Sequence, residues 1–128
     1  MKIEVSIGEV IDKITILQIK EEKITDGIKL NHIKKELNIL NQILFESGIL
    51  VPQGMIDRLK TINLELWNTE DTLREKESLE LYDEEFIRCA VADSVLNDQR
   101  FLVKNEINNH CDSNIKEQKS YQGLYKAK

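Results

Sequence analysis

The chain contains few of the residues that interrupt helices. Its 128 residues include one proline and five glycines, and both residue types are unfavourable inside helices. The glycines are scattered, so the sequence has no glycine-rich loop that could cradle a phosphate. This composition predicts long helices joined by short turns, and it argues against a nucleotide-binding loop.

Cysteine and long apolar runs are also scarce. Cys89 and Cys111 are the two cysteines; both fall in one predicted helix, about 33 Å apart, so they cannot bridge each other. The N-terminus lacks the pattern of a secretion signal, and no apolar run reaches the roughly 18 residues that a membrane span needs. We therefore expect a cytoplasmic protein that has no membrane partner.

Charge is unevenly distributed along the chain. The net charge is −5, and residues 61–112 carry thirteen acidic but only five basic side chains. Because nucleic-acid binding depends on cations that displace counterions, we expect no nucleic-acid partner. With 41% hydrophobic and 32% charged residues, the composition is typical of one globular domain over residues 1–128. In this interpretation residues 113–128 form a tail that is partly flexible or wraps the domain.

Residues 6–24 form the clearest predicted helix. Ser6 and Glu9 make a capping box at its start. At about 100° per residue, one wide face is apolar, and it consists of Ile7, Val10, Ile11, Ile14, Leu17 and Ile24. Because Ile16 and Ile19 lie on the other side, this helix is expected to be central or to form an interface.

Three more helices are expected, over residues 28–46, 52–79 and 84–110. Asp26 and Asp83 are the natural N-caps of the first and third of these, and Gly48 is a natural C-cap. Short turns make sequential helices antiparallel neighbours. The sequence thus predicts an all-α fold, a four-helix bundle built from two antiparallel helix pairs. The acidic half of the third helix, Thr69 to Glu80, has few apolar anchors and should be the loosest helical segment of the chain.

Second apolar stripes on the first and fourth helices suggest an interface. They consist of Ile16, Ile19, Leu96, Val103 and Ile107. One small bundle does not obviously cover them, so we expect a homodimer. The leading interpretation of function is accordingly a non-enzymatic interaction or assembly module.

Several polar side chains interrupt the apolar faces. They are Gln18, Glu21, Ser94, Asp98 and Asn105. If they converge between the first and fourth helices, a buried carboxylate there needs a cation, and the candidates are Lys13, Arg100 and Lys104. The favoured interpretation is a structural salt bridge from Asp98, preferably to Lys13. The alternative is a small helical enzyme or ligand-binding protein with a polar pocket at Asp12, Lys13, Asp98 and Arg100.

Other chemistries have weaker support. Neither His32 nor His110 has a glutamate three residues earlier, the spacing that metal-binding bundles use, so we expect no metal and no cofactor. All-helical nucleotide pyrophosphohydrolases follow paired glutamates with Glu-x-x-Asp, which is missing here after Glu21-Glu22 and Glu84-Glu85. The first helix resembles that of helical chorismate mutases, but those enzymes bind a dicarboxylate through arginines that this helix lacks. Trp67 suits either a pocket rim or the edge of the core.

A broader resemblance rests on the stretches SIGEVIDKITILQIK, LELWNTED, LNDQR with the following KNEIN, and EQKSY. Through motifs of the form SIGExxDKxTIL, LWxxED, NDxR and KSY, the chain resembles a family of uncharacterised proteins of about this length from bacteria and phages. The resemblance implies no activity and no catalytic residue. It implies that motif positions are occupied by Asp12, Lys13, Thr15, Trp67, Glu70, Asp71, Asn97, Asp98, Arg100, Lys119 and Tyr121. Our candidate ligand-binding residues are Asp12, Lys13, Trp67, Glu70, Asp71, Asp98 and Arg100.

Overall fold

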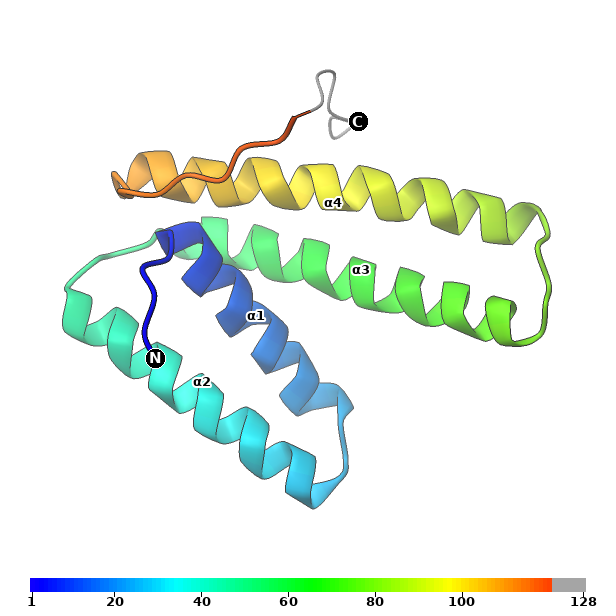
Figure 1. Cartoon of the computed structure of the whole chain (residues 1–128), viewed down its shortest axis with the longest axis horizontal. Helices are drawn as coiled ribbons and strands as arrows, with labels where there is room; N and C mark the ends of the chain where they lie inside the picture. The colour runs from blue at the N-terminus through cyan, green and yellow to red at the C-terminus, as the bar shows by residue number, and fades with distance from the viewer. Residues whose placement is uncertain (121–128) are drawn as a thin grey trace.

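A computed structural model describes residues 1–120 of the chain. That part contains four α-helices and no strand: α1 (Ile7–Lys23), α2 (Gly27–Ser47), α3 (Gln53–Ser78) and α4 (Glu84–His110). The prediction of an all-α fold built from two antiparallel helix pairs is confirmed (Figure 1). None of the helices within residues 1–120 has both the length and the apolar character required to cross a bilayer. Tyr121 and the rest of the predicted tail beyond residue 120 lie outside the described residues.

The helix ends follow local capping signals in the sequence. The side chains of Ser6, Asp26 and Asp83 accept hydrogen bonds from backbone N–H groups in the first turns of α1, α2 and α4. These N–H groups have no partner inside their own helix. Gly48 ends α2 with a φ of 69°, a left-handed conformation that glycine adopts without steric cost. The caps fix where each helix stops and keep the turns short.

Helix α1 is the centre of the fold. It contacts α2, α3 and α4, and within residues 1–120 the one other pair of helices in contact is α3 with α4. Figure 1 shows α1 and α2 as one antiparallel pair, set at an angle to the longer α3–α4 pair. Helix α2 therefore packs on the outside of α1.

The two apolar sides of α1 face two different cores. The first core lies between α1 and α2 and consists of Ile14, Leu17, Ile33 and Leu37. The second lies between α1, α3 and α4 and consists of Ile11, Leu59, Val103 and Ile107. A helix with partners on two sides needs apolar residues on two sides, which accounts for the unusual pattern of residues 6–24.

The side chains from which we expected a homodimer are mostly buried within one chain. The exposed fractions are 1% for Ile19, 8% for Leu96, 6% for Val103 and 0% for Ile107, and Ile16 is half-buried. This reason for a dimer is wrong, because the central position of α1 supplies the cover that we thought missing. Any interface between copies must therefore rest mainly on other residues.

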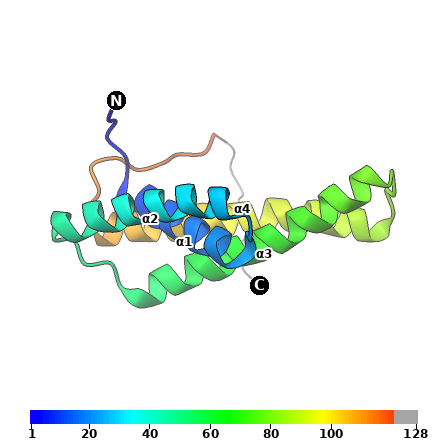
Figure 2. The same ribbon diagram turned by 90° about the horizontal axis from the view of Figure 1, so that it is seen from below.

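Helices α3 and α4 extend well beyond α1 and α2 (Figures 1 and 2). We call this extension, residues 69–95, the arm. At its tip Lys76 lies 2.9 Å from a carboxylate oxygen of Asp83 and 3.4 Å from one of Glu85. The arm is a layer of two helices, and Figure 1 shows no third helix beside it in the described part of the chain.

Candidate functional site

Asp12, in the second turn of α1, is the centre of a buried ion network. It is 1% exposed and faces Arg100 of α4. The Nε of Arg100 lies 2.9 Å from Oδ1 of Asp12, and its Nη2 donates to Oδ2. Such a two-pronged contact fixes geometry as well as charge. Two of the predicted site residues are therefore in direct contact.

Lys104 lies one helical turn beyond Arg100 and contacts three carboxylates. Its Nζ is 2.8 Å from Glu9, 3.1 Å from Glu117 and 3.8 Å from Asp12. The side chain is 7% exposed, and an ammonium group so buried is costly unless anions compensate it. Glu9 and Asp12 come from α1, whereas Glu117 comes from the segment after α4.

Thr15 and Asn63 complete the network from α1 and α3. The Nδ2 of Asn63 donates to Oδ1 of Asp12 and to Oγ1 of Thr15, both at 2.9 Å, and the Thr15 hydroxyl donates to the backbone carbonyl of Asp12 at 2.8 Å. We call the whole network the Asp12 cluster. It consists of Glu9, Asp12, Thr15, Asn63, Arg100, Lys104 and Glu117. Three helices are thus joined at one buried point.

The charges of the Asp12 cluster stabilise one another. Burial alone would raise the pKa of Asp12, but hydrogen bonds from Arg100 and Asn63 outweigh it and hold that pKa below its usual value. Burial would likewise lower the pKa of Lys104, yet the carboxylates of Glu9 and Asp12 raise it above its usual value. Both groups are therefore ionised at neutral pH, and α1 is held to α4 by opposite charges.

The start of α1 lies unusually close to α4. The backbone N–H of Gly8 donates to the side-chain carbonyl of Asn108 at 2.7 Å. A Cβ placed on Gly8 would lie 2.5 Å from the backbone oxygen of Lys104, closer than real Cβ atoms approach. Gly8 therefore allows the close crossing that brings Asp12 within reach of Arg100.

A second group of predicted residues lies along α3. Trp67, Glu70, Asp71 and Arg74 line one hollow of about 250 Å³. Burial raises the pKa of Glu70, and the nearby carboxylate of Asp93 in α4 raises it further. Glu70 and Asp93 therefore form a pair of carboxyl groups that face each other across the α3–α4 hairpin.

Other predicted residues are placed differently. Asp98 is 5% exposed, so its predicted burial is confirmed. Lys13 is exposed, and it forms no ion pair within residues 1–120, so the predicted Asp98–Lys13 salt bridge is wrong. The five polar residues that interrupt the apolar faces do not all converge on one pocket, because Glu21 and Ser94 are exposed. In the Asp12 cluster the buried carboxylate comes from α1 and its cations from α4, whereas we expected a carboxylate from α4 and a cation from α1.

Sequence reasoning missed three members of the Asp12 cluster: Glu9, Asn63 and Glu117. The local pattern assigns Glu9 to a capping box, and Glu117 follows the last helix, where no periodicity predicts a neighbour. Asn63 did carry a signal. It lies between Leu59 and Leu66 on the apolar face of α3, and a polar side chain in that position usually has a buried partner.

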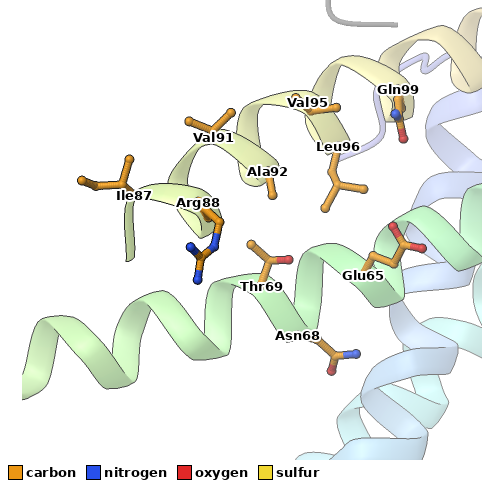
Figure 3. Close-up of a pocket in the computed structure, with 10 residues that line it drawn as sticks. All are labelled: Glu65, Asn68, Thr69, Ile87, Arg88, Val91, Ala92, Val95, Leu96 and Gln99. Carbon is orange, nitrogen blue, oxygen red and sulfur yellow. The ribbon is translucent and has the colours of Figure 1, made fainter. Parts of the chain in front are cut away.

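An apolar groove runs along the arm (Figure 3). It has a volume of about 810 Å³. The lining residues are Glu65, Asn68, Thr69, Ile87, Arg88, Val91, Ala92, Val95, Leu96 and Gln99. Figure 3 shows Ala92 and Leu96 reaching toward α3, whereas Val91 points away from it. At about 100° per residue, Ile87, Val91 and Val95 lie on the other side of α4 from Arg100 and Lys104, whereas Leu96 lies one turn before Arg100. We call it the arm groove.

Metal-ligating side chains do not gather in the described part of the chain. Within residues 1–120, no three His, Cys, Asp or Glu side chains are arranged to hold a metal ion. His32 and His110 are both exposed. The carboxylates of the Asp12 cluster instead face Arg100 and Lys104.

Comparison with known proteins places the chain in a family. A model of the family of unknown function DUF6165 matches residues 1–126. Because the match spans nearly the whole chain, the chain belongs to this family, and the expected membership of an uncharacterised family is confirmed. No curated protein and no solved structure matches the chain. The individual motifs and the bacterial or phage origin stay predictions.

Proposed function

We propose that this member of a family of unknown function is an assembly module whose arm pairs with the arm of a second copy of the chain. The observation that carries the proposal is the arm groove. Ile87 and Val91 are 59% and 52% exposed, and they lie one turn apart on α4. Removing such side chains from water is favourable, and contiguous exposed apolar surface typically marks an interface.

The shape of the arm supports a second copy as the occupant. Two helices in one layer bury only the faces that they turn toward each other. A second, identical layer placed on the groove would produce a four-helix bundle, in which helices pack with crossing angles of about 20°. A closed two-fold pair is also the commonest arrangement of homo-oligomers.

The charges beside the groove suit a two-fold pairing. Glu70 and Asp93 face each other across the hairpin and so mark one level along the two helices. Glu65 lies five residues from that level toward α1, and Arg88 lies five residues from it toward the tip. Each offset is about 7.5 Å. A two-fold axis across the helices at this level would bring Arg88 of each copy to the level of Glu65 in its partner, with the tips pointing in opposite directions.

The first test replaces an apolar groove residue with a charge. In Val91→Glu two carboxylates would meet near the axis, so we expect the dissociation constant of the dimer to rise about 100-fold or more. Ile39→Glu is the matched control, because Ile39 is 50% exposed but lies on α2. Light scattering across a concentration series measures the mass. A monomeric wild-type chain at every concentration, or equal weakening by both variants, would overturn the proposal.

The second test exchanges the two charges. Arg88→Glu and Glu65→Arg should each weaken the dimer, because each would place like charges at one level of the interface. The double variant restores opposite charges and should recover most of the wild-type affinity. Recovery is specific to a two-fold pairing, since a different partner protein would have no reason to tolerate both exchanges. Additive weakening in the double variant would refute this geometry.

A further inference from the structure

A second groove continues the arm groove along the α3–α4 pair, at the end that carries α1. Its volume is about 430 Å³. It lies between Thr61 and Ile62 of α3 and Leu102 and Val103 of α4, and its lining residues within residues 1–120 all come from these two helices. Gln99 lines both grooves, and Figure 3 shows it at the end of the arm groove that is closer to α1. We call the second groove the inner groove.

The two grooves lie on one face of the α3–α4 pair. On α4 the residues that line them recur at intervals of four and three, in the order Arg88, Ala92, Val95, Gln99, Leu102 and Glu106. This spacing keeps side chains on one stripe of a helix, and long pairs of helices pack through such stripes. On α3, Leu79 follows Thr61 by 18 residues, which is five full turns. The stripe of α3 that lines the inner groove therefore reaches the tip of the arm at Leu79.

The tip of the arm carries three exposed apolar side chains. They are Leu79, Leu81 and Tyr82, and we call them the apolar tip. The turn that bears them is ordered by backbone hydrogen bonds, one of which runs from the N–H of Leu81 to the carbonyl of Lys76 at 2.9 Å. Large apolar side chains held together in water are unfavourable, and contiguous exposed apolar surface typically marks a contact.

The proposed pairing of the arms puts the apolar tip of one copy opposite the inner groove of the other. Its two-fold axis lies at the level of Glu70 on α3 and Asp93 on α4. Leu79 and Thr61 are each nine residues from Glu70, on opposite sides, and so lie about 13.5 Å from the axis. The first residue of α4 and Leu102 are likewise each nine residues from Asp93. Because a two-fold axis exchanges its two sides, each tip meets the level of the partner's inner groove on both helices.

We propose that the inner groove receives the apolar tip of a second copy of the chain, an inference that rests on the proposed pairing of the arms. Ile62, Leu102 and Val103 supply apolar surface in the groove. Leu79 supplies apolar surface on the tip, so contact between tip and groove removes both surfaces from water. A two-fold pair repeats every contact, and each end of the dimer is therefore closed by one tip.

Filling the inner groove lengthens the interface and fixes its register. The arm groove spans α4 from Ile87 to Gln99, about 18 Å, and the inner groove extends the contact to Glu106, about 28 Å. A stable dimer buries about 800 Å² per copy, which favours the longer contact. A slip of one helical turn, about 5.4 Å, would carry Leu79 away from the level of Thr61 in the partner.

Cross-linking between two different variants tests this placement. Chains that carry Thr61→Cys are mixed with chains that carry Leu79→Cys and treated with a short bis-maleimide. The mixture should give a covalent dimer, because one thiol of each variant lies at the same level. Neither variant alone should do so, since its own two new thiols would be about 27 Å apart. Cys89 and Cys111 are present in every sample and report any background cross-linking.

The second measurement is the affinity of the dimer. Leu79→Ser should raise the dissociation constant about 10-fold or more, because each dimer loses two leucine side chains from its interface. Leu50→Ser is the matched control, since Leu50 is also an exposed leucine but lies in the turn between α2 and α3, outside both grooves. Both side chains are exposed in the single chain, so neither variant should lose stability as a monomer.

The outcomes separate this inference from the proposed pairing of the arms. If the wild type dimerises and Val91→Glu weakens the dimer, but the mixture cross-links no better than either variant alone, the arms pair without the tips in the inner grooves and the inference is overturned. Equal effects of Leu79→Ser and Leu50→Ser on the dissociation constant would also overturn it. Cross-linking of Leu79→Cys chains with one another would place the two tips side by side and overturn both proposals. A monomeric wild-type chain at every concentration would do the same.

Discussion

Arg100 of α4 holds both carboxylate oxygens of Asp12 in α1, although 88 positions separate the two residues in the sequence. The contact joins the first helix to the last at a point where α3 also contributes Asn63. A buried ion pair is seldom a large net source of stability compared with apolar residues of the same size. It does make the packing specific, because any other rotation or register of α1 would leave these charges buried and unpaired.

Asp12→Asn should destabilise the chain strongly. The change keeps the shape of the side chain but removes the charge that compensates Arg100 and Lys104. Loss of one partner of a buried ion pair costs about 3–5 kcal/mol in the free energy of unfolding, which denaturant titration measures. Glu106→Gln breaks the exposed pair with Arg58 and should cost about 1 kcal/mol or less. Equal losses of unfolding free energy in the two variants would show that the Asp12 cluster stabilises the fold no more than an exposed ion pair does.

Local signals in the sequence were sufficient to predict the helices but not the contacts between them. Ser6 and Gly48 act within a few residues of their own positions, so the helix ends could be predicted. Lys13 follows Asp12 directly and therefore points about 100° away around the helix. Asp12 and Lys13 therefore cannot both face α4. Which of the two faces it depends on the angle at which α1 crosses α4, and no local sequence pattern encodes that angle. The contacts were accordingly predicted in part: Asp12 and Arg100 do meet, whereas the ion pair of Lys13 with Asp98 does not form, and ligand binding by these residues stays a prediction.

Gly8→Ala should destabilise the chain despite the higher helix propensity of alanine. The new Cβ would lie 2.5 Å from the backbone oxygen of Lys104, so α1 and α4 would have to move apart. Overpacking of this kind costs about 1–3 kcal/mol, and a thermal or denaturant melt would detect it. Gly54→Ala is the control, because a Cβ there has no atom within 4 Å and should be neutral or stabilising. An unchanged stability in Gly8→Ala would mean that the crossing of α1 and α4 has room for a Cβ at this position.

The arm should exchange its backbone amide hydrogens faster than α1. Residues 69–78 of α3 lie in a layer of two helices, whereas α1 packs against three other helices. Local opening of the arm exposes less buried surface and so costs less free energy. Hydrogen exchange at low chain concentration measures this difference. Equal protection of the arm and α1 at low chain concentration would contradict this prediction. If the arms pair as proposed, protection of the arm should increase with chain concentration.

Glu70→Gln should raise the melting temperature at neutral pH. Burial and the carboxylate of Asp93 raise the pKa of Glu70 above its ordinary value of 4.5. The folded chain therefore holds the proton more tightly than the unfolded chain, and the free energy of unfolding falls as pH rises from the ordinary value through the folded one. Above that window two carboxylates face each other, and Arg74 and Arg100 offset them in part, so a neutral amide removes the repulsion and can donate to Asp93. The gain should disappear in acid, where Glu70 is already protonated.

Asp71→Asn, at the neighbouring exposed position, is the control and should change the melting temperature little at either pH. A lower melting temperature of Glu70→Gln at neutral pH would show that the two arginines outweigh Asp93.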